Sequence, residues 1–160
     1  MSMRTRSRIV VAMFTSLLVS GFAQVSAAEG CNDASAVGSY AFKVDGTNVS
    51  IPLPGGPGPF AAVGKNTYDG MGHMAGVIVV SSNGTIISAT YTGTYHVNTD
   101  CTGYKTFTLS IGGTVGPTID MDFVLDDDLR EIRMIISDPG FAVSGSARKL
   151  FTDAESEETE

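Results

Sequence analysis

Residues 85–98, TIISATYTGTYHVN, decide the fold class of this chain. Apolar or small residues occupy every second position, and Ser, Thr and His stand between them. A period of two is typical of a β-strand that buries one face. The first set is Ile87, Ala89, Tyr91, Gly93, Tyr95 and Val97, and the second is Ser88, Thr90, Thr92, Thr94 and His96. We therefore expect a long strand here, with its tyrosines pointing into a core.

The same alternation recurs along the rest of the chain. Residues 104–111 oppose Phe107 and Leu109 to threonines, and residues 115–125 oppose an apolar set to two aspartates. That apolar set is Val115, Ile119, Met121, Phe123 and Leu125, with Asp120 and Asp122 facing away. Turn residues such as Asn83-Gly84 separate the patterned runs, because Asn and Gly tolerate positive φ.

These runs predict an all-β fold in a single domain, residues 28–151. We expect strands at about 38–45, 60–68, 73–81, 85–97, 104–111, 114–125, 129–137 and 141–151. Short turns between successive strands favour an antiparallel up-and-down barrel of about eight strands, because closure removes exposed sheet edges. A β-sandwich is the alternative.

The N-terminus has the features of a secretory signal peptide. Three arginines precede an apolar stretch from Ile9 to about Phe22, and small residues lead to Ala27. The apolar stretch is too short and interrupted to span about 30 Å of hydrocarbon. We expect residues 1–27 to be removed on export, leaving no membrane span in the mature chain, in a periplasmic or extracellular location.

The charge balance excludes one class of partner. The full chain has a formal net charge of −7, and removal of residues 1–27 takes three arginines and no acid, giving −10. Nucleic acids bind proteins with a basic footprint, so we expect no nucleic-acid partner. Residues 152–160 carry a block of acids of the kind that is usually a disordered, solvated tail.

Two cysteines, Cys31 and Cys101, are the only ones in the chain. In an oxidising compartment such a pair predicts a disulfide. Closure of a loop of about 70 residues would stabilise the fold by roughly 4 kcal/mol in the chain-entropy model. The competing interpretation is a reactive thiol or a metal ligand, but neither cysteine has a second Cys or a His at ligand spacing.

The longest irregular stretch, residues 46–60, holds four of the six prolines. Proline cannot donate to a strand ladder, so no regular element is expected there. We expect a loop that folds over one mouth of the barrel through Ile51, Leu53 and Phe60, with a solvated connection as the alternative.

Several of these elements together resemble a group of small exported bacterial proteins of unassigned function. The shared pattern is a Cys followed by Gly38-Ser39-Tyr40, then Asp69-Gly70-Met71-Gly72, Val97-Asn98-Thr99-Asp100-Cys101-Thr102-Gly103 and Asp138-Pro139-Gly140. More distantly, the chain is similar to calycin and allene-oxide-cyclase-type barrels. The resemblance implies a single secreted β domain and assigns no catalytic residue.

Polar residues of the chain form no pattern that predicts chemistry. A metal site would need His73, His96 and an aspartate to meet across strands, so we predict no metal site and no cofactor. Asp120 and Asp122 project from one face, but the calcium-loop pattern is missing. Catalytic residues remain unknown, and an outward acidic face that maintains solubility is the simplest interpretation.

The inward aromatic residues are the candidate ligand-binding site. Eight-stranded barrels are either filled by side chains or hold one small ligand, and tyrosines give apolar walls with a polar tip. The candidate residues are Tyr40, Tyr91, Tyr95, Phe107, Met121 and Phe123. We expect a non-catalytic protein that binds a small apolar or amphipathic ligand. A barrel isomerase or cyclase and a structural or adhesive surface protein are the alternatives, and the oligomeric state is open.

Overall fold

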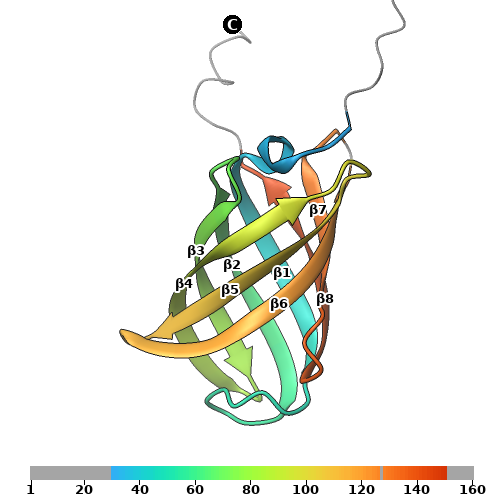
Figure 1. The fold of residues 1–160 in the computed structure, drawn as a ribbon. Coiled ribbons are helices and arrows are strands. Elements are labelled where there is room, and N and C mark those ends of the chain that lie inside the picture. Colours follow the sequence, from blue (N-terminus) through green and yellow to red (C-terminus); the bar gives the residue numbers. More distant parts are fainter. Residues whose placement is uncertain (1–29, 127, 151–160) are drawn as a thin grey trace, which may run out of the picture.

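The computed structural model describes residues 30–126 and 128–150, which form one closed barrel of eight antiparallel strands (Figure 1). Each strand pairs with the next along the chain, and the last pairs with the first. The strands are β1 (Gly38–Asn48), β2 (Gly58–Tyr68), β3 (His73–Ser82), β4 (Thr85–Val97), β5 (Thr102–Ile111), β6 (Thr114–Asp126), β7 (Glu131–Ile136) and β8 (Phe141–Lys149). The predicted up-and-down barrel is confirmed, and the sandwich alternative is wrong.

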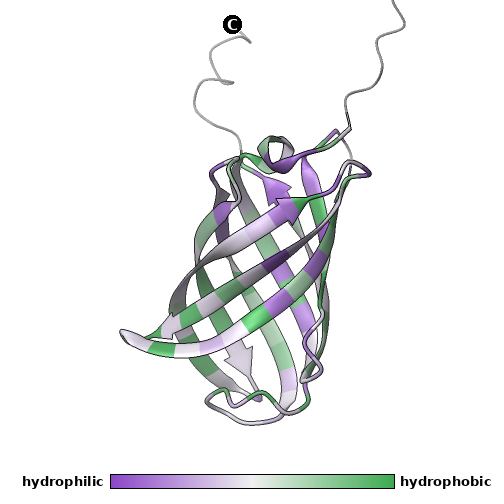
Figure 2. Cartoon of the chain, in the orientation of Figure 1, coloured by the Kyte–Doolittle hydropathy of each residue, from purple (hydrophilic) through white to green (hydrophobic). Residues whose placement is uncertain are grey.

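The alternation of β4 places its side chains as expected. Tyr91, Tyr95 and Val97 are buried, whereas Thr92 and His96 are exposed. Figure 2 shows the same alternating bands of hydropathy along the other strands of the barrel. Because a closed sheet has one interior, the apolar side of every strand contributes to a single core.

One predicted inward residue lies outside. Thr108 pairs with Thr118, but Ser110 pairs with Val115, so β6 carries one extra residue at this point of the ladder. Such a β-bulge reverses the facing of the residues beyond it. The expectation that Val115 shares a face with Ile119 is therefore wrong, and Val115 is 80 % exposed.

A short 3-10 helix, η1 (Asp33–Ala36), lies across one end of the barrel (Figure 1). The Asp33 carboxylate accepts the Val97 N–H at 2.7 Å, and the Asp33 carbonyl accepts the Tyr95 hydroxyl at 2.9 Å. Cys31, just before η1, forms a disulfide with Cys101 in the turn after β4, with the Cα atoms 5.0 Å apart. The predicted disulfide is confirmed, and it ties this covering segment to the barrel.

The loop between β1 and β2, residues 49–57, crosses the opposite end (Figure 1). The Asn48 side chain holds the turn, because its amide nitrogen donates to the Ile51 carbonyl and its oxygen accepts the Ile51 N–H, each at 2.9 Å. Leu53 is buried and packs with the core cluster. The loop thus folds over one mouth of the barrel, as its apolar residues predict. The expectation that residues 46–60 form no regular element is wrong at both ends, because residues 46–48 belong to β1 and residues 58–60 belong to β2, where they pair with each other.

The predicted signal peptide, residues 1–27, and the predicted acidic tail, residues 152–160, lie outside the described residues. Within residues 30–126 and 128–150, no helix is long and apolar enough to cross a bilayer.

Replacement of both cysteines, by Cys31→Ser with Cys101→Ser, should lower the free energy of unfolding by about 2–4 kcal/mol. The physical reason is that a sequence separation of 70 residues is no longer closed in the unfolded chain. Urea unfolding followed by circular dichroism measures the change, and the reduced wild-type protein should match the double variant. A loss of stability below about 1 kcal/mol would contradict this role of the disulfide.

Candidate ligand-binding site

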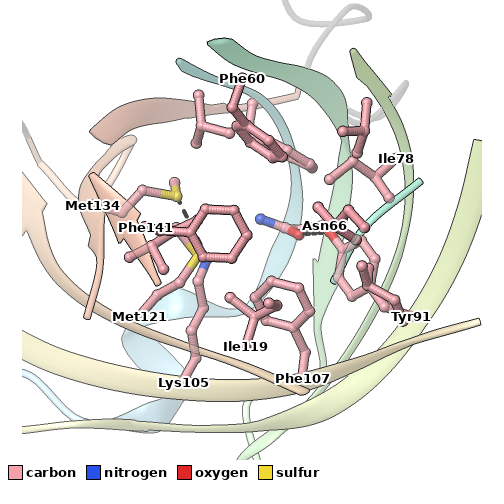
Figure 3. Close-up of a pocket in the computed structure, with 16 residues that line it drawn as sticks. Phe60, Asn66, Ile78, Tyr91, Lys105, Phe107, Ile119, Met121, Met134 and Phe141 are labelled. Atoms are coloured by element: carbon pink, nitrogen blue, oxygen red, sulfur yellow. Dashed lines mark hydrogen bonds between the residues drawn. The ribbon is translucent and has the colours of Figure 1, made fainter. Parts of the chain in front are cut away.

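The barrel interior contains a cavity of about 40 Å³, to which every strand contributes at least one side chain (Figure 3). The lining residues are Phe42, Val44, Leu53, Phe60, Asn66, Ile78, Val80, Tyr91, Lys105, Phe107, Leu109, Ile119, Met121, Met134, Ile136 and Phe141. Only Asn66, Tyr91 and Lys105 carry a nitrogen or oxygen in the side chain. The site is therefore an apolar chamber with a few polar groups, as small-molecule sites commonly are.

Lys105 is the unexpected member of this lining. It shares the inward face of β5 with Phe107 and Leu109, and its exposed fraction is 2 %. Its Nζ donates to the Tyr68 hydroxyl at 3.0 Å and lies 3.6 Å from the Met134 sulfur, an interaction drawn in Figure 3. Among the described residues, none of the ion pairs includes Lys105.

A row of polar side chains leads from Lys105 across the barrel. Asn66 Nδ2 donates to the Tyr68 hydroxyl at 3.3 Å, and the Tyr91 hydroxyl donates to Asn66 Oδ1. Gly76, which pairs with both Asn66 and Tyr91, makes room for this contact, because a Cβ there would overlap the Tyr91 ring. We call Lys105, Tyr68, Asn66 and Tyr91 the polar row.

Burial changes the acid–base behaviour of the polar row. It lowers the pKa of the Lys105 amine from 10.5 to about 7, because the charged form loses its hydration. Burial also raises the pKa of Tyr68 and Tyr91 well above 10.0. The two phenols therefore remain protonated at neutral pH, whereas the amine exists in both charged and neutral forms.

The structure brings half of the predicted ligand-binding residues to the cavity. Tyr91, Phe107 and Met121 line it, whereas Tyr40, Tyr95 and Phe123 do not. The Tyr40 hydroxyl donates to the Leu129 carbonyl, and Tyr95 joins Asp33 of η1, so both hold the covered end. Phe123 is buried beside Lys105, with Nζ 6.0 Å from its ring centroid.

The other polar candidates lie on the outside of the barrel. His73 contacts Asp69 at 3.1 Å and His96 contacts Asp33 at 3.3 Å, so the two imidazoles have different partners. In the part of the chain that the structure describes, no three His, Cys, Asp or Glu residues are grouped to hold a metal. Asp120 is exposed and accepts a hydrogen bond from Thr106 at 2.6 Å.

The sequence interpretation missed Lys105, Asn66 and Tyr68. A signal for Lys105 was present, because it lies two residues before Phe107 and therefore on the apolar side of the same alternation. Asn66 and Tyr68 likewise share a strand face with the buried Ala62. Of these three residues, Asn66 and Lys105 line the cavity, whereas Tyr68 lies behind it and contacts Lys105.

No protein-family model, curated protein or solved structure matches this chain. The resemblance to small exported bacterial proteins stays a prediction, and the cavity has to be interpreted from its own geometry.

Because the pKa of Lys105 is lowered by burial, the free energy of unfolding should rise with pH above neutrality. The Lys105 pKa in the folded state, about 7, lies below its ordinary value of 10.5, so the unfolded chain binds more protons between these values. The free energy of unfolding should therefore increase from pH about 7 to about 9.5, by at most about 1.4 kcal/mol per pH unit. Urea unfolding at several pH values measures this slope.

The Lys105→Met variant, which keeps an unbranched side chain without the amine, should lose this pH dependence. Lys65→Met is the matched control, because Lys65 is exposed on the outside of β2 and its replacement should leave the slope unchanged. Equal slopes in the wild type and in Lys105→Met would contradict a titrating buried amine.

Proposed function

We propose that the protein is an exported, non-catalytic binding protein that takes one small apolar or amphipathic compound into the barrel. The supporting observation is the cavity itself, an interior space bounded by mostly apolar side chains from all eight strands and by Asn66, Tyr91 and Lys105 of the polar row. Burial of an apolar ligand there removes about 25 cal/mol of unfavourable hydration per Å² of its surface. The few polar groups would fix its orientation.

The size of the cavity limits the ligand. A buried water needs roughly 10–15 Å³ of such volume, so a space of about 40 Å³ suits a compound with only a few heavy atoms. Met121 and Met134 line the space, and their flexible side chains adapt to guests of different shape. A longer ligand would require Leu53 to move away from the barrel mouth.

The loop of residues 49–57 offers the simplest entrance. It is held by local hydrogen bonds, such as Leu53 N–H to the Ile51 carbonyl at 2.8 Å, and by two amide donors to Gly140. The opposite end is closed by η1, which the disulfide ties to β4 and β5. Opening the loop would break hydrogen bonds and apolar contacts only, whereas the η1 end is also held by a covalent bond.

The disulfide and the N-terminal sequence both support a location outside the cytoplasm. A disulfide suggests an oxidising location outside the cytoplasm. Together with the predicted signal peptide, it supports a periplasmic or extracellular binding protein. The acidic composition agrees with a ligand that is not a nucleic acid.

A small probe such as 1-propanol should bind inside the barrel in a saturable manner. We expect the methyl signals of Met121 and Met134 to shift in carbon-13 NMR spectra of methionine-labelled protein, because both line the cavity. Met74 is buried but does not line the cavity, and Met71 is exposed, so their signals should remain in place.

A filled cavity should abolish this binding. Val44→Ile with Val80→Ile adds two methyl groups to the lining while keeping β-branched residues in the strands. The control, Val63→Ile with Val77→Ile, adds the same volume at exposed positions and should bind like the wild type. Equal shifts at all four methionines, or binding that the filled variant retains, would overturn the proposed function.

A further inference from the structure

We infer that the ligand carries a carboxylate, which the Lys105 and Asn66 side chains bind at the wall of the cavity. This inference rests on the proposed function and names the chemical class of its ligand. Its basis is an excess of hydrogen-bond donors over acceptors in the polar row.

The donors and acceptors of the polar row do not balance. The amine, the amide nitrogen and the two phenols carry roughly six or seven polar hydrogens. Among the described residues the row makes four interactions, from Tyr91 to Asn66, from Asn66 to Tyr68, and from Lys105 to Tyr68 and Met134. The Met134 sulfur is only a weak acceptor. Roughly three or four hydrogens therefore have no good acceptor, although every buried polar atom there has a partner.

A carboxylate fits this deficit better than other small polar groups. An ionised carboxylate only accepts, with about four lone-pair positions, whereas an alcohol adds another donor and an amine adds a second cation. A carboxylate also supplies a negative charge, and none of the described partners of Lys105 carries one. Charged hydrogen bonds of this kind are stronger than neutral ones.

The rest of the cavity suits the remainder of such an acid. Phe60 and Phe141 pack edge to face, with ring centroids 5.3 Å apart, and they line the cavity together with Leu53. Phe60 lies near the start of β2 and Phe141 at the start of β8, both close to the loop that closes the mouth. A short apolar tail would extend from the polar row toward these side chains.

Ligand binding should be coupled to proton uptake. The groups that face Nζ are Tyr68 from β2, Phe123 from β6 and Met134 from β7, with Tyr91 of β4 further along the row. The phenols stay protonated because burial raises their pKa values. Lys105, with a pKa of about 7, is therefore the group that gains a proton when a carboxylate binds.

Matched probes test the inference. Propanoate, 1-propanol and propylamine have tails of similar size and differ in the head group, and the methionine spectra report binding of each. At pH 7 the wild type should bind propanoate at least tenfold more tightly than 1-propanol, and propylamine most weakly. The Lys105→Met variant should lose the preference for propanoate over 1-propanol, and Lys65→Met should behave like the wild type.

A pH series on the wild type gives a second measurement that needs no variant. Propanoate affinity should fall by up to about tenfold per unit from pH about 7.5 to about 9.5, whereas 1-propanol affinity should stay constant. Binding of 1-propanol without preference for propanoate, or propanoate affinity independent of pH, would overturn the carboxylate inference and leave the proposed function intact. Failure of all three probes to bind would overturn both.

Discussion

Barrel closure is the constraint on which the rest of the structure depends. When β8 pairs with β1, no sheet edge is left, and every second side chain of each strand enters one shared interior. A side chain on that face has no route back to water through a strand edge. The interior therefore has to be filled, satisfied by hydrogen bonds, or left as a cavity.

The two halves of the interior meet this constraint differently. Near η1 the rings of Tyr40, Tyr68 and Tyr95 pack edge to face, with centroid distances of 5.6 and 4.9 Å. Tyr95 also hydrogen-bonds to Asp33, so ring packing and polar contacts close that end together. Toward the β1–β2 loop, aliphatic and phenylalanine side chains leave the cavity unfilled. Tyr68 lies between the two halves and connects the packed layer to Lys105.

Local pattern was sufficient for much of this architecture. The alternation in residues 85–98 and the turn signals around it predict the strands, and the predicted signal peptide together with two cysteines predicts the Cys31–Cys101 pair. The inward orientation predicted for Val115 was wrong because of a β-bulge. A bulge depends on which residues of β5 and β6 pair, and the sequence of one strand does not specify that pairing. The cavity could not be predicted either, since its volume depends on how side chains from eight strands pack.

Lys105 shows how a local pattern and a global constraint combine. Its position on β5 directs the side chain inward, and closure prevents the amine from reaching water along its flexible stem. A leucine or methionine would fill the same place without losing hydration, so the amine is expected to be a cost to the folded state. The lowered pKa limits that cost, because the neutral amine is easier to bury than the ammonium ion. A negatively charged acceptor that enters the cavity would favour the ammonium form, so the amine that is costly to bury is also the group best placed to hold a guest.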